Sequence, residues 1–223
     1  MCFNRDEDKK LENIHYFVEL IKVLLGKNIL GDETMKNSIL KKYDKQLGGL
    51  FFILTVLFII LAMTNQTFFD LAYERHQNQL SWYVRPLFII PFCYFAYKRS
   101  WTGIMGTMFM VITSMFWFPK PVYVSHQVVE FLEMEKEYLT GNWNLSKVLI
   151  ALLIPASLSA LAIAFWRRSL LVGIAVMVFI ALAKISWSVA LGGESGKSVL
   201  VPAMLGLIIC IILIFIGFKR MEN

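Results

Sequence analysis

The sequence predicts an all-α fold: a polytopic helical membrane protein with six transmembrane helices, both termini in the cytoplasm and an N-terminal amphipathic helical arm. Three observations predict this class: six long apolar runs, basic residues that close them on alternate sides, and tryptophans at their boundaries. The runs lack the alternation of strands, and lipid admits only helices or closed barrels. The predicted spans are residues 50–69, 83–97, 101–118, 148–166, 169–190 and 199–218.

The distribution of charge predicts the orientation of these spans. The 223-residue chain carries a formal net charge of +6, and 57 % of its residues are hydrophobic. Nine of the 22 Lys and Arg residues precede residue 50, and basic pairs follow at 98–99, 167–168 and 219–220. Six alternating spans place all of these on one side, which the positive-inside rule assigns to the cytoplasm. We therefore expect a lipid bilayer as the partner, in the plasma (inner) membrane, and no nucleic acid.

Tryptophans support the same boundaries. The indole ring is apolar while its N–H needs a polar partner, so tryptophan concentrates where a span leaves the hydrocarbon. The outer boundaries are expected at Trp82, Trp117, Trp143 and Trp187, and the inner ones at Trp101 and Trp166.

The second span is the least regular of the six. The run 83–97 has 15 residues, which makes about 22 Å of helix against roughly 30 Å of hydrocarbon. We expect it to borrow residues 80–82, to thin the bilayer or to be partly unwound. Together with the third run it also fits a re-entrant hairpin, which leaves four true spans. Pro91 and Pro155 lie inside the second and fourth runs, where proline tends to kink a helix.

Residues 1–48 form the predicted cytoplasmic arm, and residues 49–220 form the transmembrane domain. Apolar residues recur at helical spacing in 9–26 and again in 33–46. Such helices either pack under the membrane domain or on the anionic leaflet, or they dock a cytoplasmic partner or a second subunit. The fourth span repeats small residues at every fourth position, which fits packing within one bundle or in a homo-oligomer: Ala156, Ala160 and Ala164.

The longest outer loop, residues 119–147, contains a predicted helix at 125–139. A stripe of three carboxylates lies on one face of this helix: Glu130, Glu133 and Glu137. Carboxylates can gather a hard cation, but an acidic stripe on an exposed helix is more often a solvated face. No His or Asp ligand follows at a metal-like spacing, so we predict no metal site and no cofactor.

Lys184 is the strongest candidate for a functional side chain. It lies inside the fifth run, where an ammonium group is costly, so it faces a cavity or a partner unless its stem snorkels to the headgroups. Asp70, Glu74 and His76 follow the first run, and Arg85 opens the second. We predict that these five residues line one outer polar vestibule, with Asp70 paired with Lys184 or Arg85. The alternative is ordinary interfacial charge around a tight outer loop.

Enzyme motifs are missing from the sequence. It has no GxSxG, HExxH or CxxC pattern, and residues 192–198 miss the phosphate-binding loop pattern by one position. We interpret that segment as a turn. No internal sequence repeat is evident.

Three classes of function remain open. The leading hypothesis is passage of a small solute or ion through a polar cavity near Lys184, by a protein that is not an enzyme. The second is a membrane-embedded enzyme that acts on lipid or a small substrate at the outer leaflet, prompted by the acidic residues and His76. The third is a non-catalytic accessory or sensor subunit, prompted by the amphipathic arm.

Overall fold

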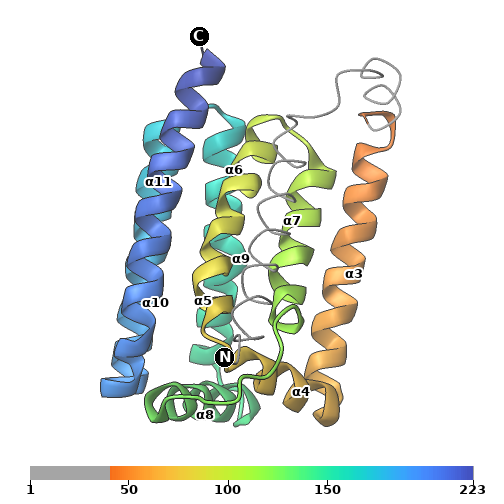
Figure 1. Ribbon diagram of the computed structural model, residues 1–223. Coiled ribbons are helices and arrows are strands. Elements are labelled where there is room, and N and C mark those ends of the chain that lie inside the picture. Colours follow the sequence, from red (N-terminus) through yellow and green to blue (C-terminus); the bar gives the residue numbers. More distant parts are fainter. Residues whose placement is uncertain (1–40, 223) are drawn as a thin grey trace, which may run out of the picture. The chain divides into compact units, whose positions relative to one another are not determined.

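The computed structural model describes residues 41–222, and these residues form helices, turns and loops without strands (Figure 1). From residue 45 onward, the described residues belong to one compact unit. The predicted arm helix at 9–26 lies outside the described residues, as does most of the one at 33–46. The all-α prediction is confirmed for the described part of the chain.

Several helices run side by side, and two others lie across one end of them (Figure 1). The first group comprises α3 (Asp44–Thr64), α6 (Ile89–Tyr97), α7 (Trp101–Thr113), α9 (Leu145–Trp166), α10 (Leu170–Gly196) and α11 (Leu200–Glu222). The crossing helices are α4 (Gln66–His76) and α8 (His126–Thr140). Short helices connect them: α5 (Leu80–Val84), η1 (Arg85–Phe88), η2 (Ser114–Phe116) and η3 (Lys197–Val199).

Within residues 41–222, three helical stretches are long and apolar enough to cross a membrane: Asp44–Thr64, Leu145–Trp166 and Leu170–Arg220. The last of these contains α10 and α11, which pack against each other on either side of a break at Gly193, where φ is 52°. In the most apolar 18 residues of each stretch, at most 22 % of the residues are buried inside the protein. Apolar surface exposed to this extent indicates contact with a lipid bilayer. A fourth apolar stretch, Trp101–Phe116, is shorter.

The predicted second span is built from three pieces, α5, η1 and α6. Residues 80–82 belong to α5 and the middle piece is a 3₁₀ helix, so the helical segment is longer than the predicted run and irregular in its middle. Pro91 lies in the first turn of α6, where a missing N–H removes no intrahelical hydrogen bond. The carbonyl oxygen of Pro86 accepts a hydrogen bond from Cys210 Sγ at 3.1 Å. Pro155, by contrast, lies inside the continuous helix α9.

The α6–α7 and α9–α10 hairpins turn through the same backbone motif. Each first helix is followed by an arginine in the left-handed region, Arg99 at φ 57° and Arg168 at φ 59°, and then by a serine at the next N-cap. The backbone hydrogen bonds correspond: Arg99 N–Ala96 O (3.0 Å) with Arg168 N–Phe165 O (2.9 Å), and Ser100 N–Phe95 O (3.0 Å) with Ser169 N–Ala164 O (3.0 Å). Both turns are Schellman-type helix ends. The structure therefore contains a repeated turn where we noted no repeat in the sequence.

The main apolar core lies between α6, α7, α9, α10 and α11. Aromatic rings meet within it: Tyr97 and Phe218 at 4.7 Å between centroids, and Phe165 and Phe218 at 5.0 Å. Glycines let these rings approach the neighbouring helix, since a Cβ on Gly173 would lie 2.5 Å from the Phe165 ring. The core therefore depends on large rings packed against bare backbone.

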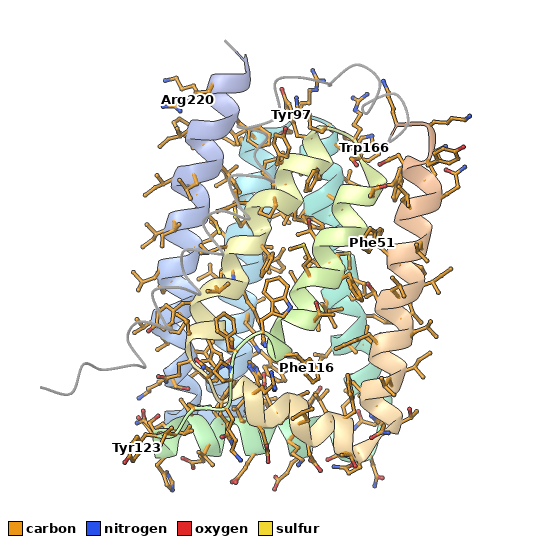
Figure 2. The ribbon with its side chains drawn as sticks, turned by 45° about the vertical axis from the view of Figure 1, so that its right-hand side comes forward. Phe51, Tyr97, Phe116, Tyr123, Trp166 and Arg220 are labelled. Atoms are coloured by element: carbon orange, nitrogen blue, oxygen red, sulfur yellow. The ribbon has the colours of Figure 1, made fainter. Side chains whose placement is uncertain are left out.

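The two ends of the helices differ in chemistry. Tyr97, Trp166 and Arg220 lie at one end, whereas Phe116 and Tyr123 lie toward the other (Figure 2). We call the first the basic end, because it carries the exposed residues Lys98, Arg99, Arg167, Arg168, Lys219 and Arg220. The second, covered by α4 and α8, is the crossed end. The rings of Trp101 and Trp166, both predicted at the inner boundary, meet at 5.4 Å between centroids.

Two glycines of α11 provide a matched test of this packing. A Cβ added to Gly206 would lie 2.5 Å from Pro86 Cβ and 2.8 Å from Pro86 Cγ, whereas one added to Gly217 would meet nothing within 4 Å. The proline ring is rigid, so we expect Gly206→Ala to destabilise the protein by about 1–3 kcal/mol. Gly217→Ala should stabilise it by up to about 1 kcal/mol through helix propensity. Thermal unfolding in detergent measures both, and equal effects of the two substitutions would contradict the packing of α11 on η1.

Candidate functional site

The crossed end is assembled by local sequence signals on α4 and α8. The side chain of Asn65 accepts a hydrogen bond from Phe68 N at 3.0 Å and caps α4, so the first long helix ends at Thr64 and not at residue 69 as predicted. The helix α8 lies between Ser125 and Gly141, in agreement with the prediction. Val128, Phe131 and Leu132 are its buried residues. Both crossing helices therefore present apolar faces to the ends of the long helices.

Arg85 lies at the centre of the polar groups of this end. Its Nε donates a hydrogen bond to Ser114 Oγ at 3.2 Å, and its Nη1 lies 3.1 Å from His76 Nε2. Its Nη2 is buried and has no hydrogen-bond partner in the described part of the protein. One guanidinium thus joins η1, η2 and α4, and keeps one nitrogen free for another acceptor.

His76 is held as a neutral imidazole. Both ring nitrogens of His76 face donors, Arg85 Nη1 at 3.1 Å from Nε2 and the indole Nε1 of Trp82 at 3.2 Å from Nδ1, so a neutral ring can accept from one of them and a protonated ring from neither. The indole Nε1 of Trp82 donates to the carbonyl of His76 at 3.0 Å and lies 3.2 Å from Nδ1. Burial lowers the pKa of His76 well below its ordinary value, and the charges of Arg85 and Lys184 lower it further. The imidazole therefore stays uncharged at neutral pH.

Lys184 reaches across from α10 to α8. Its Nζ forms an ion pair with Glu135 Oε1 at 3.0 Å, and it lies 5.0 Å from the ring centroid of Trp187 and 5.9 Å from that of Phe131. The Lys184 side chain is 49 % exposed, while that of Glu135 is 16 % exposed. The ammonium group of Lys184 thus contacts a carboxylate and two aromatic rings at the crossed end, and these contacts offset the free-energy cost of placing a charge in an apolar helix.

The predicted pairing of Asp70 with Lys184 or Arg85 is wrong. Asp70 pairs with Lys136 of α8, and Gln66 Nε2 donates to the same carboxylate oxygen at 3.1 Å. Hydrogen bonds from Lys136, and then from Gln66, lower the pKa of Asp70. The acid lies on α4 and faces the crossing helix α8, because α4 starts a new direction after Asn65.

The remaining acidic candidates are at the surface. Glu74 lies 3.3 Å from Lys120, and both side chains are at least half exposed. Glu130, Glu133 and Glu137 are exposed, and Glu130 Oε2 lies 3.8 Å from His126 Nδ1. Within residues 41–222, no three His, Cys, Asp or Glu side chains are grouped as ligands of one metal ion.

Sequence reasoning missed Glu135 and Lys136, although a signal for Glu135 was present. Val128, Leu132 and Glu135 follow one another at helical spacing, so Glu135 continues the buried face of α8. Lys136 lies one position further along and faces α4. The ring of Tyr73 lies 6.3 Å from that of His76 between centroids, and burial, together with the charge of Glu135, raises the pKa of its phenol. The structure therefore unites Tyr73 and His76 of α4 with Arg85, Glu135 and Lys184.

Buried polar atoms without a partner gather at the crossed end. Those found in the described residues are Ser81 Oγ, Arg85 Nη2, Tyr138 OH, Trp187 Nε1 and Ser188 Oγ. The rings of Tyr138 and Trp187 meet at 5.4 Å, and Lys184 lies over the second of them. Most of these atoms can donate a hydrogen bond, so they suit an acceptor.

Charge gives the same preference for an acceptor. Lys184 is balanced by Glu135, and Asp70 by Lys136, while Arg85 forms no ion pair with a carboxylate of the described residues. The cluster of Tyr73, His76, Arg85, Glu135 and Lys184 therefore carries one excess positive charge. We call it the Arg85 cluster.

Comparison with known proteins yields no relative: no family model, curated protein or solved structure matches this chain. The fold and the Arg85 cluster are therefore the basis for any assignment of function.

The pH dependence of stability tests the environment of His76. The unfolded chain binds a proton below its ordinary pKa of about 6.5, whereas the buried imidazole does not, so stability falls as the pH decreases. Below pH 6.5 the loss is at most about 1.4 kcal/mol per pH unit from this group. We expect His76→Gln to flatten thermal unfolding temperature against pH between 7.5 and 5. His126→Gln, at a site 93 % exposed, is the control. An unchanged slope in the His76 variant would contradict a buried neutral ring.

Proposed function

We propose that the chain is a multi-pass integral membrane protein of six spans, with the basic end in the cytoplasm and the crossed end outside. The two hairpin turns and the C-terminal end of α11 all lie at the basic end, which carries the three basic pairs of the sequence. The crossed end, covered by α4 and α8, carries none of these basic pairs, as the positive-inside rule expects of an outer face. The plasma (inner) membrane remains the proposed location.

The Arg85 cluster is proposed as an outward-facing binding site for a small anion of single charge. The observation that carries this proposal is the buried Nη2 of Arg85, which has no acceptor among the described residues. An unpaired guanidinium nitrogen in a low-dielectric site is costly, and an anion would remove this cost. One excess positive charge favours a monovalent ligand such as a carboxylate. The neutral His76 lets the guanidinium keep its full charge toward the ligand.

Passage of this anion across the membrane is the second candidate function, and it is the one favoured by the sequence. The supporting observation is the interrupted helix α5–η1–α6, which carries Arg85 at its break, as transporters carry binding residues on broken helices. The apolar core between the Arg85 cluster and the basic end would have to open for passage. Passage is therefore proposed as a property of a second conformation.

A membrane-embedded enzyme is the less favoured reading of the same residues. An acid–base catalyst needs a ring nitrogen directed at its substrate. Both nitrogens of His76 already face protein groups, Arg85 and Trp82. The imidazole thus acts as a support for the guanidinium. An accessory or sensor role remains compatible with an outward-facing site.

Anion binding is tested by substitution of Arg85. We expect sodium acetate to raise the unfolding temperature of the purified protein in a saturable way at constant ionic strength, because the ligand binds only the folded state. Arg85→Gln should abolish this increase. Lys120→Gln is the matched control, since it removes one positive charge from the crossed end outside the cluster. Formate and chloride extend the series by size. An acetate response that survives in Arg85→Gln would exclude this site.

Access to Lys184 distinguishes one-sided binding from passage. In a background with Cys2, Cys93 and Cys210 replaced by serine, Lys184→Cys is exposed to a membrane-impermeant maleimide from each side of oriented vesicles. His126→Cys and Arg220→Cys report the two ends, because both side chains are exposed. We expect labelling of position 184 from the side of His126. Labelling from both sides would support passage, and labelling only from the side of Arg220 would refute the proposed orientation.

A further inference from the structure

The repeated turn at the basic end contains a residue choice that backbone energetics disfavours. Arg99 and Arg168 are the non-glycine residues with positive φ in the described part of the chain. The C′ position of a Schellman turn favours glycine, because a side chain in the left-handed region costs about 1–2 kcal/mol. The same costly choice occurs twice, at corresponding positions of two hairpins. We conclude that the arginine side chains contribute something that glycine cannot.

Each arginine contacts the other hairpin. Arg99 Nε donates to the carbonyl of Trp166, at the end of α9, at 3.3 Å. The guanidinium carbon of Arg168 lies 4.9 Å from the ring centroid of Tyr97, at the end of α6. The two turns are adjacent, since α6 packs along α9 (Figure 1). Both guanidinium groups are therefore held at the junction of the hairpins.

These contacts use only a small part of each guanidinium. A guanidinium has five N–H donors, and the hydrogen bond to Trp166 uses one of those on Arg99. Arg99, Arg168 and the adjacent Lys98 and Arg167 are exposed, and none of the four forms an ion pair with a carboxylate within residues 41–222. The side chain of Ser169 makes no N-cap hydrogen bond, so the start of α10 adds partial positive charge. The junction is a concentrated donor surface for an anion.

The tryptophans show how deep this surface lies. Trp101 and Trp166 meet at 5.4 Å beside the two turns, and indole rings concentrate at the level of lipid headgroups. The phosphate groups of lipids lie at that same level, next to the donors of Arg99 and Arg168. Planar guanidinium groups match the oxygens of a phosphate.

We propose that the junction of the two hairpins binds the phosphate group of an anionic lipid in the leaflet at the basic end, with Arg99 and Arg168 as its main ligands. The binding site rests on the proposed membrane embedding but not on the Arg85 cluster, so a failure of acetate binding at that cluster would not bear on it. A soluble phosphate ester shares the recognised group and differs from the lipid in lacking the acyl chains.

The test replaces both arginines with the residue that their backbone favours. The double variant Arg99→Gly/Arg168→Gly removes the donors and relieves the left-handed strain; Asn at both positions is a second variant, because Asn also tolerates this conformation. The detergent-solubilised protein is titrated with phosphatidylglycerol, phosphatidylcholine or glycerol phosphate, and bound ligand is measured by native mass spectrometry. Lys219→Gln/Arg220→Gln is the matched control, which removes two exposed charges from the same end.

We expect the wild type to bind phosphatidylglycerol in preference to phosphatidylcholine. A basic residue near a headgroup contributes about fivefold, so loss of both proposed phosphate ligands in the glycine variant should weaken binding about thirtyfold. Lys219 and Arg220 lie at the end of α11, outside the two turns, so the control should weaken binding at most about fivefold. If the glycine variant and the Lys219→Gln/Arg220→Gln control lost affinity for phosphatidylglycerol equally, the effect would come from the overall positive charge of this end, and the proposed site would be wrong. If the affinity were unchanged in both the glycine and the asparagine variants, the arginines would serve only to connect the two turns, and the proposed site would also be wrong. If glycerol phosphate bound as tightly as phosphatidylglycerol, the acyl chains would not contribute, and the proposal that the bound phosphate group belongs to a lipid would be wrong.

Discussion

The placement of one guanidinium group governs the crossed end of this protein. Arg85 stays charged among the packed helices, so its guanidinium needs hydrogen-bond acceptors from other elements. Ser114 and His76 supply them, and in doing so they join η2 and α4 to the interrupted helix. The cap at Asn65 turns α4 across the bundle, which brings His76 within reach. The arrangement of these elements thus provides hydrogen-bond acceptors for a charged group that is removed from water.

The basic end depends on the two hairpin turns and on the arginine that each of them contains. Its two hairpins close with the same hydrogen-bond pattern, and each turn accepts an arginine in a conformation that favours glycine. Large rings packed on glycines bring the helices close enough for Arg99 and Arg168 to contact the opposite turn. The result is a donor-rich surface at the level of the tryptophans, separated from the crossed end by an apolar core.

This separation shapes the functional interpretation. Buried polar atoms without partners occur at the crossed end, whereas the described basic side chains of the other end are exposed. A buried donor with no acceptor favours a specific small ligand, because its cost is removed only by a group that fits. Exposed donors favour a partner that arrives from outside, such as a headgroup. The two proposed sites therefore differ in ligand and in the test that each requires.

Local patterns in the sequence determined the apolar helices, the helix α8 and the irregular helical segment α5–η1–α6, because length, capping and proline act over a few residues. They also marked Lys184 and Arg85 as charges in need of partners. The partners themselves were decided by tertiary structure. Asp70 pairs with Lys136 and Lys184 with Glu135 because α4 and α8 cross the same end, a relation between helices that no local pattern contains. The left-handed arginines were likewise hidden, since sequence favours glycine at such turns and only the packed hairpins show what the arginines contact.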